Sequence, residues 1–424
     1  MASFSFGAGN AAKLARIPLY VAGRLATVVI PRSSDEWVFG CGAGVGDGAL
    51  ALWRRVAADG HTAVWLVGSE SEAADASALG IPHVRRMSLR GFWRTARARV
   101  VVVTHGFGDV NRYAVSGAFI AQLWHGIPLK RIGLDSPETL RSSILPGSRL
   151  LRRALGAMYR ATTRQIDVLP AASPLVRGRL ESAFGLTDSR VPVTGEPRVD
   201  VLSAGTPDER RRSARAVLAA AGLAALGDAR LVLYAPTWRD GEPDPAIPTA
   251  AEWRRLIDTL EARDAVLLVR SHPLGAGDYE PPFATDRVHP LGSSRLNDAT
   301  PVLPALTTLI TDYSSMAFDA SLVPLPVLFL APDVEAYGLR RGFYGRFTDV
   351  AGADTATTWD EMIDQLDALL GDPLVRDERI ARSVALSERV HSYRDGENTA
   401  RVYRAILNGA RLAGGAPEHR ESTE

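Results

Sequence analysis

The chain has 424 residues, two to three times the length of a typical domain, so its length predicts two domains. Its 49 basic and 48 acidic residues nearly cancel, which leaves no net field to attract nucleic acid. The single cysteine, Cys41, excludes an internal disulfide, and no Cys/His cluster has the spacing of a structural zinc site. These features favour a cytoplasmic globular protein without a nucleic-acid partner.

The first 35 residues form an amphipathic segment ahead of the regular pattern. Its apolar run, residues 17–30, carries Arg24 at its centre. The run has about fourteen residues, whereas a bilayer span needs roughly 20. No charged n-region or small-residue cleavage pattern accompanies it, so we expect no secretory signal.

Apolar runs of strand length then alternate with helical patterns. In the first half the runs cover residues 37–40, 61–68 and 98–104, with a helical pattern over residues 49–58. This alternation predicts βαβ units and a parallel sheet. Gly42, Gly44 and Gly46 follow the first strand, but their spacing is not the dinucleotide fingerprint, so we expect no nicotinamide cofactor.

The second half repeats the pattern. Strands are expected at residues 166–170, 191–194, 230–234, 265–270, 308–311 and 326–330. The predicted fold is α/β, with two doubly wound domains over residues 36–165 and 166–412 and ligands at the carboxyl ends of the strands. Residues 377–412 have a helical pattern, and residues 413–424 read as a disordered tail.

The densest polar cluster covers residues 122–130, where a strand passes into a loop. Its histidine, His125, is flanked by glycine and proline, which indicates a constrained loop. An imidazole with an ordinary pKa near about 6.5 can take a proton from an alcohol at neutral pH. A lone histidine is more often a core residue, but Lys130 and Arg131 would place cations beside a bound anion. These cations favour a binding site.

Two later strand ends carry arginines. The strand ending at Tyr234 leads to Thr237 and Arg239, and a planar guanidinium can hold a phosphate through two hydrogen bonds. The next strand ends on Arg270, which is followed by His272. A structural salt bridge stays open for either arginine alone, but the repeated placement favours ligand binding.

A fourth cluster follows the strand over residues 308–311. It consists of Asp312, Tyr313, Ser314 and Ser315, and a helix is expected to begin at one of the serines. Small hydroxyl residues there can cap the helix, and the free N–H groups at a helix start can bind phosphate. This motif alone does not separate the two roles.

Together these segments resemble the CDP-glycerol glycerophosphotransferase family, which comprises teichoic acid primases and polymerases and related capsule polymerases. The resemblance rests on five motifs: Trp124-His125-Gly126-x-Pro128-Leu129-Lys130-x-Ile132-Gly133-x-Asp135, Gly195-x-Pro197-Arg198-x-Asp200, Ala235-Pro236-Thr237-Trp238-Arg239, Arg270-x-His272-Pro273 and Thr311-Asp312-Tyr313-Ser314-Ser315. It spans roughly residues 37–403, most of the chain.

The resemblance implies a GT-B fold with a cleft between its domains, the acceptor side being residues 36–165 and the donor-nucleotide side residues 166–412. It implies transfer of a polyol phosphate, with glycerol phosphate favoured, from a CDP-activated donor to a hydroxyl of a lipid-linked or polymer acceptor, with release of CMP. Such a reaction serves teichoic acid or capsule synthesis. Phosphoryl transfer asks mainly for positioning and charge neutralisation.

By the same resemblance, His125 is the general base on the acceptor hydroxyl, and His272 stabilises the leaving CMP. The implied substrate-binding residues are Lys130, Asp135, Arg198, Thr237, Arg239, Arg270, Asp312, Tyr313, Ser314 and Ser315. No metal ligand is assigned, because no D-x-D pair stands at a strand end. A divalent metal requirement is left open.

Three positions depart from the family pattern. Ile127 and Arg131 stand where threonine and lysine are frequent, and Glu196 stands where tyrosine is common. These departures leave the preferred polyol and the acceptor open, and with them the choice between primase and polymerase.

Residues 141–164 contain six arginines and no acid among apolar residues. Such a basic amphipathic segment can lie in an anionic lipid interface on the inner face of the cell membrane, and residues 13–32 are a weaker case. A solvated helix covering the N-terminal domain explains the pattern equally well, so both interpretations stay open.

Two other functions are compatible with the predicted architecture. The first is a nucleotide-sugar glycosyltransferase or a UDP-sugar 2-epimerase, although an epimerase would need a pair of acids that the sequence does not offer. The second is an inactive scaffold in wall or capsule assembly, against which His125 and His272 argue.

Overall fold

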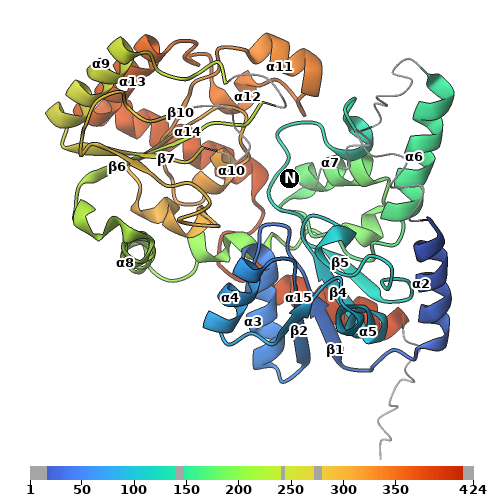
Figure 1. The fold of residues 1–424 in the computed structure, drawn as a ribbon. Helices are drawn as coiled ribbons and strands as arrows, with labels where there is room; N and C mark the ends of the chain where they lie inside the picture. The colour runs from blue at the N-terminus through green and yellow to red at the C-terminus, as the bar shows by residue number, and fades with distance from the viewer. Residues whose placement is uncertain (1–16, 140–147, 240–243, 272–278, 414–424) are drawn as a thin grey trace, which may run out of the picture. The chain divides into compact units, whose positions relative to one another are not determined.

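The computed structural model describes residues 17–139, 148–239, 244–271 and 279–413 (Figure 1). The chain divides into two compact units. Unit 1 comprises Met1–His125, Thr139–Arg198 and Glu397–Glu424, and unit 2 comprises Gly126–Glu138 and Val199–Gly396. Both units therefore contain segments that are distant in the sequence.

Unit 1 is built on a five-stranded sheet in which every pair of neighbouring strands is parallel. In spatial order the strands are β3 (His83–Arg85), β2 (Thr62–Val67), β1 (Glu36–Phe39), β4 (Val100–Val103) and β5 (Phe119–Gln122). The helices are α2 (Ile17–Val29), α3 (Asp47–Ala58), α4 (Glu70–Ala78), α5 (Leu89–Arg97), α6 (Arg149–Thr163), α7 (Pro174–Phe184) and α15 (Asn398–Ala413). The strand order reverses between β1 and β4, which is the point where doubly wound sheets bind ligands.

Unit 2 repeats this topology. Its sheet runs β10 (Val327–Phe329), β9 (Thr308–Thr311), β6 (Arg230–Ala235), β7 (Ala265–Val269) and β8 (Val288–Pro290), again parallel throughout. Its helices are α8 (Pro207–Leu218), α9 (Ala250–Ala262), α10 (Met316–Ala320), α11 (Val334–Arg341), α12 (Thr348–Ala351), α13 (Trp359–Gly371) and α14 (Pro373–Val390). The predicted pair of doubly wound α/β domains is thus confirmed.

The cores follow from the alternation of side chains along buried strands. In β6, Leu231 and Leu233 join a cluster with α8, whereas Val232 and Tyr234 join a second cluster with α9 and α13. Helices therefore cover both faces of this sheet, which is why its strands read as continuous apolar runs. In unit 1 a core cluster includes Trp37 of β1 and side chains of α3 and α15.

Most predicted strands are confirmed to within two or three residues, but two are wrong. Residues 166–170 and 191–194 form no strand and make only single parallel bridges, Ala121 with Val168 and Ala171 with Val193. Most of their residues are buried, so their apolar character reflects packing and not a ladder. Two further strands, β3 and β8, were not predicted, because each has only three residues and one of them is a histidine.

The C-terminal segment predicted as helical contains two helices. The helical conformation is interrupted between α14 and α15. There Gly396 has a φ of +76°, and a β-carbon at this position would lie 2.8 Å from backbone atoms of Ala204. Glycine alone accepts that conformation and that contact readily. The break separates the units, since α14 belongs to unit 2 and α15 to unit 1.

Candidate active site

The carboxyl end of the sheet in unit 1 presents two histidines on neighbouring strands. β4 leads to Thr104 and His105, and β5 leads to Trp124 and His125. The two imidazole rings are stacked, with centroids 4.1 Å apart and an angle of 1° between their planes. Parallel strands end at the same sheet edge, which explains why residues twenty positions apart meet here.

The backbone around His105 is held by a buried carboxylate. Oδ2 of Asp109 accepts hydrogen bonds from the amides of Thr104 at 3.0 Å and His105 at 2.7 Å. The Thr104 hydroxyl lies 2.8 Å from Nδ1 of His105. Opposite the ring, a β-carbon at Gly42 would lie 2.6 Å from Cγ of His105, so only glycine leaves room for the imidazole.

The loop that carries His125 adopts an unusual backbone. Trp124 has a φ of +64°, a conformation that costs a non-glycine residue about 1–2 kcal/mol. Its indole lies 4.1 Å from the His125 ring and packs edge-on against Phe184 of α7 at 5.1 Å. The packing of the Trp124 side chain therefore offsets the cost of its backbone conformation. The same side chain covers part of His125.

Burial lowers the pKa of His125 well below its ordinary value, and His105 and Arg198 lower it further, whereas a backbone hydrogen bond with Thr104 opposes the shift. Burial and Arg198 also lower the pKa of His105, to about 4. Both rings are therefore neutral near pH 7. Arg198 itself forms an ion pair with Asp47 at the start of α3, with N and O 3.3 Å apart.

The chain crosses into unit 2 immediately after His125. Residues 126–138 pair there with the segment that follows α11: Lys130 forms an antiparallel bridge with Phe343, and the amide of Tyr344 donates to Leu129 at 3.0 Å. Asp135 accepts a hydrogen bond from the Tyr344 hydroxyl at 2.6 Å. The first motif is thus divided between the units.

Lys130 lies among aromatic and charged groups of unit 2. Its Nζ is 5.9 Å from the ring centre of Tyr337. Burial lowers the pKa of Lys130 to about 8; Asp312 opposes this shift, and Arg341 and Arg239 add to it. A nearby anion would raise this pKa again and stabilise the charged form of the lysine.

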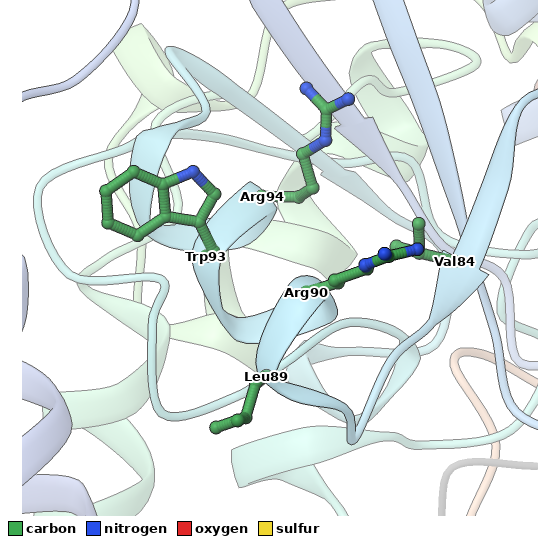
Figure 2. A pocket seen from close by; sticks show the side chains of 5 residues that line it. All are labelled: Val84, Leu89, Arg90, Trp93 and Arg94. Carbon is green, nitrogen blue, oxygen red and sulfur yellow. The ribbon is translucent and has the colours of Figure 1, made fainter.

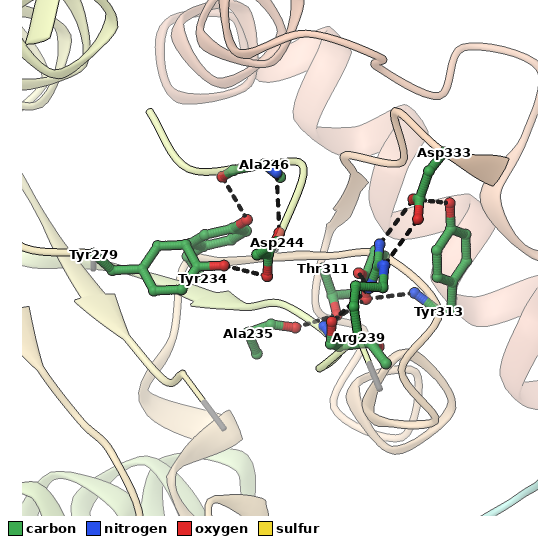
Figure 3. A network of polar contacts seen from close by, with 11 residues as sticks. Tyr234, Ala235, Arg239, Asp244, Ala246, Tyr279, Thr311, Tyr313 and Asp333 are labelled. Carbon is green, nitrogen blue, oxygen red and sulfur yellow. Dashed lines mark hydrogen bonds and ion pairs between the residues drawn. The ribbon is translucent and has the colours of Figure 1, made fainter. Parts of the chain in front are cut away.

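Arg239 is the centre of a polar network in unit 2 (Figure 3). Its Nε and Nη2 donate to the two carboxylate oxygens of Asp333 at 2.8 Å, and its Nη1 donates to Asp312 at 2.8 Å. The guanidinium also lies 4.9 Å from the ring centres of Tyr313 and Tyr337. The side chain is 4 % exposed, and the two carboxylates already occupy its nitrogens.

Asp312 and Tyr313 support this network. Oδ1 of Asp312 accepts from the amides of Thr237 at 2.8 Å and Tyr313 at 2.6 Å, which joins the ends of β6 and β9. The Tyr313 hydroxyl donates to Asp333 at 2.8 Å. Burial raises the pKa of Asp333, but the hydrogen bonds and charge of Arg239 outweigh it and leave the pKa lowered.

Two hydroxyl groups lie beside the network. Oγ1 of Thr237 is buried and has no hydrogen-bond partner among the described residues. Ser314 accepts a hydrogen bond from the Met316 amide at 3.2 Å, and Ser315 precedes the five-residue helix α10. The expected helix start is therefore present, and Ser314 acts as a local cap.

The remaining predicted residues are placed differently. Arg270 donates to backbone carbonyls of Leu291, Leu296 and Asn297 at 2.7–3.1 Å, so it holds the loop after β8. His272 lies outside the described residues. The structure thus brings His125 and Arg198 together in unit 1, and Lys130, Arg239, Asp312, Tyr313 and Thr237 together in unit 2.

Three residues at these sites were not predicted from the sequence: His105, Asp333 and Tyr337. His105 follows a predicted strand directly, which was a usable signal, whereas Asp333 is far from Arg239 in the sequence. No group of three or more potential metal ligands occurs within the described ranges. In the same ranges, no helix is long and apolar enough to cross a membrane.

Comparison with known proteins shows which family this sequence matches. A model of the CDP-glycerol:poly(glycerophosphate) glycerophosphotransferase family matches residues 38–408. The teichoic acid glycerol-phosphate transferase of Staphylococcus aureus is 27% identical over 336 residues, which cover 77% of this chain and 80% of that protein. The sequence therefore resembles these transferases along most of its length.

Solved structures agree on the fold. The wall teichoic acid polymerase TagF superposes with a TM-score of 0.70 at 21% identity, over 94% of this chain and 93% of that chain. A putative UDP-N-acetylglucosamine 2-epimerase from Listeria monocytogenes gives 0.50 at 15% identity, over 92% of this chain and all of that one. Fold alone does not separate transferase from epimerase, but the family match favours the transferase.

Proposed function

The chain belongs to the CDP-glycerol:poly(glycerophosphate) glycerophosphotransferase family, and from this premise we propose that it transfers glycerol phosphate from CDP-glycerol to a hydroxyl of a growing or lipid-linked polymer. CMP is the second product. The polymer is of the teichoic acid kind. The observation that carries the proposal is the neutral histidine at the sheet edge of unit 1, on the motif that the family shares.

His125 would serve as the general base on the acceptor hydroxyl. Its lowered pKa keeps it unprotonated at neutral pH, as a base must be. The acceptor oxygen would attack the β-phosphorus of the donor, the bond from that phosphorus to the bridging oxygen would break, and the proton would pass to His125. The electron pair leaves with CMP, for which His272 is the proposed partner.

Donor phosphates would bind in unit 2. Lys130 is a buried cation there whose charge a bound phosphate would stabilise. Thr237 has a buried hydroxyl without a partner among the described residues. Ser314 and Ser315 would add hydrogen bonds at the start of α10.

Arg239 would act on the phosphate only indirectly, through the network that it holds, because Asp312 and Asp333 already occupy its nitrogens. Arg270, Arg198 and Asp135 would shape the surrounding loops.

The acceptor side is therefore assigned to unit 1 and the donor side to unit 2. We assign residues 126–138 to the donor side, although the sequence pattern alone had grouped them with the acceptor side. A CDP-linked polyol other than glycerol would fit the same phosphate contacts.

The test is product release with defined donors. The purified protein is incubated with CDP-glycerol, CDP-ribitol or a UDP-sugar and a lipid-linked acceptor, while CMP or UDP release and product length are followed. CMP release that needs the acceptor and is lost in His125→Ala supports the proposal, with His83→Ala on β3 as the matched control. UDP release, or unchanged turnover in His125→Ala, would refute it.

Peripheral attachment to the inner face of the cell membrane completes the proposal. In α6, Leu155 and Tyr159 face the protein, whereas Leu150 and Met158 are 78% and 56% exposed. Five arginines on or next to the same helix are also exposed: Arg149, Arg152, Arg153, Arg160 and Arg164. A helix with exposed apolar and basic side chains and no acid suits an anionic lipid surface.

Two further helices of unit 1 expose apolar side chains. In α2, Leu25, Val28 and Val29 are 64–82% exposed. On α5, Leu89 is 90% and Trp93 49% exposed, and both line an open hollow of about 530 Å³ together with Val84, Arg90 and Arg94 (Figure 2). Exposed tryptophan beside arginine is typical of residues at a lipid interface, which supports the proposed attachment.

A further inference from the structure

A general-base histidine usually needs an orienting partner. The common partner is a carboxylate or carbonyl that accepts a hydrogen bond from the second ring nitrogen and so fixes the plane of the ring. In His125, Nδ1 is buried and has no hydrogen-bond partner among the described residues. The backbone of Thr104 contributes a hydrogen bond to His125, and the Thr104 carbonyl also accepts one from Nε2 of Gln122 at 2.7 Å. The plane of the His125 ring is therefore set by this backbone contact together with the rings that pack against it.

We propose that His105 is the positioning residue of His125, and that stacking of the two rings fixes the plane of the His125 imidazole. The proposal rests on the proposed role of His125 as base. The two rings are parallel to within 1° at 4.1 Å, so the plane of one defines the plane of the other. The Trp124 ring also packs against His125, with ring centroids 4.1 Å apart and 35° between their planes.

The His105 ring is itself held from three directions. Asp109 fixes its backbone amide, the Thr104 hydroxyl contacts its Nδ1, and Gly42 leaves just enough room for its Cγ and Cβ. A ring held in this way can act as a rigid platform, whereas a mobile surface histidine could not. His105 touches no reacting atom in this scheme and acts only through His125.

The charged and titratable groups around the stack belong to four elements. Arg198 lowers the pKa of both rings, and Asp47 of α3 pairs with Arg198. Asp109 lies on the loop after β4. Cys41, on the loop after β1, stays a neutral thiol because burial raises its pKa to about 12. A second imidazolium beside His125 would oppose its protonation, so loss of His105 should make His125 easier to protonate.

The test compares a planar and a non-planar replacement of similar bulk. We expect His105→Phe to keep kcat for CMP release within about threefold, because it preserves the stack. His105→Leu should lower kcat at least tenfold and leave KM for CDP-glycerol within twofold. In both variants the acid limb of the pH profile should move to higher pH, which a purely structural defect would not cause. His83→Leu is the matched control.

A second variant leaves His105 in place and displaces its ring. Gly42→Ala should lower kcat in the same way, with thermal melting used to establish that each variant is folded. Equal kcat in His105→Leu and the parent protein would overturn the proposal, and so would an equal loss in His105→Phe and His105→Leu. If His125→Ala keeps its turnover, the base assignment fails instead, independently of His105.

Discussion

At the scale of residues, loss of one partner from a buried ion pair of unit 2 should lower the stability more than the same loss from an exposed pair. Arg239 and Asp312 are 4% and 3% exposed, so neither charge has water to replace its partner. Removing one partner of such a pair leaves an unpaired buried charge, which costs about 3–5 kcal/mol. On the surface the same change typically costs about 1 kcal/mol or less.

Asp312→Asn should therefore lower the free energy of unfolding by about 3 kcal/mol, because the Arg239 guanidinium loses a charged acceptor. Asp360→Asn is the matched control: Asp360 pairs with Arg255 at 2.7 Å, but the two side chains are 68% and 41% exposed. Urea unfolding of both variants measures the difference. Equal destabilisation would show that the Arg239 network is not the stabilising unit we infer.

At the scale of elements, α6 has one face that packs on unit 1 and another that is exposed. Its buried residues, Leu155, Tyr159 and Thr163, recur every four positions and pack on unit 1. The exposed face combines arginines with Leu150 and Met158. A helix needed only for packing would gain nothing from the exposed apolar residues.

The paired substitution Arg152→Gln and Arg153→Gln should weaken binding to vesicles that contain phosphatidylglycerol. At about 1 kcal/mol for each charge near the surface, the loss is about 30-fold. Arg211→Gln with Arg212→Gln, an adjacent exposed pair on α8 of unit 2, is the control and should bind like the parent. Co-sedimentation measures both. Equal losses in the two pairs would indicate a general charge effect and no membrane face.

At the scale of the whole molecule, the chain returns to unit 1 after completing unit 2. Val402, Tyr403 and Ile406 of α15 belong to the core that contains Trp37 of β1. The fold of the N-terminal unit is therefore complete only when the last helix is in place. This connectivity couples the two ends of the chain energetically.

Deleting residues 397–424 should unfold unit 1. Three large side chains leave its core, each worth about 1.5–3 kcal/mol, and their sum approaches the stability of a domain. Deleting residues 414–424 removes none of these contacts and should preserve the fold. Soluble yield and circular dichroism distinguish the two variants. A folded, active protein without residues 397–424 would contradict the role we give α15.

Acid should destabilise the protein partly through the histidine stack. The pKa of His105 is about 4 in the folded protein and near about 6.5 in an unfolded chain, so between these values the unfolded state binds more protons. Stability conferred by neutral His105 is therefore complete above about pH 6.5 and is lost as the pH falls to 4, a loss of about 3 kcal/mol.

Unfolding free energies at pH 7 and 5 test this effect. The loss should be smaller in His105→Phe than in the parent protein, because phenylalanine binds no proton. His83→Phe controls for the added ring. An identical loss in the parent and in His105→Phe would show that His105 does not contribute to acid sensitivity.

Much of the fold could be predicted from the sequence, and so could the polar strand ends that we propose to bind phosphate. The long apolar runs around β1, β2, β6 and β7 predicted parallel strands because both of their faces are buried. Polar residues directly after such strands, as at Thr237 and Asp312, necessarily gather at one edge of a sheet. Short strands such as β3 and β8 carry too few residues for a periodic signal.

Tertiary structure decided which of these residues meet. The motif with His125 and Lys130 is continuous in sequence, but the chain passes from one unit to the other between them. Asp333 reaches Arg239 across 94 positions, and no local pattern encodes such a contact. Local sequence thus determined the elements and their polar ends through periodicity. The partners of each charge and the stacking of His105 on His125 depended on how distant strands align, which only the folded chain settles.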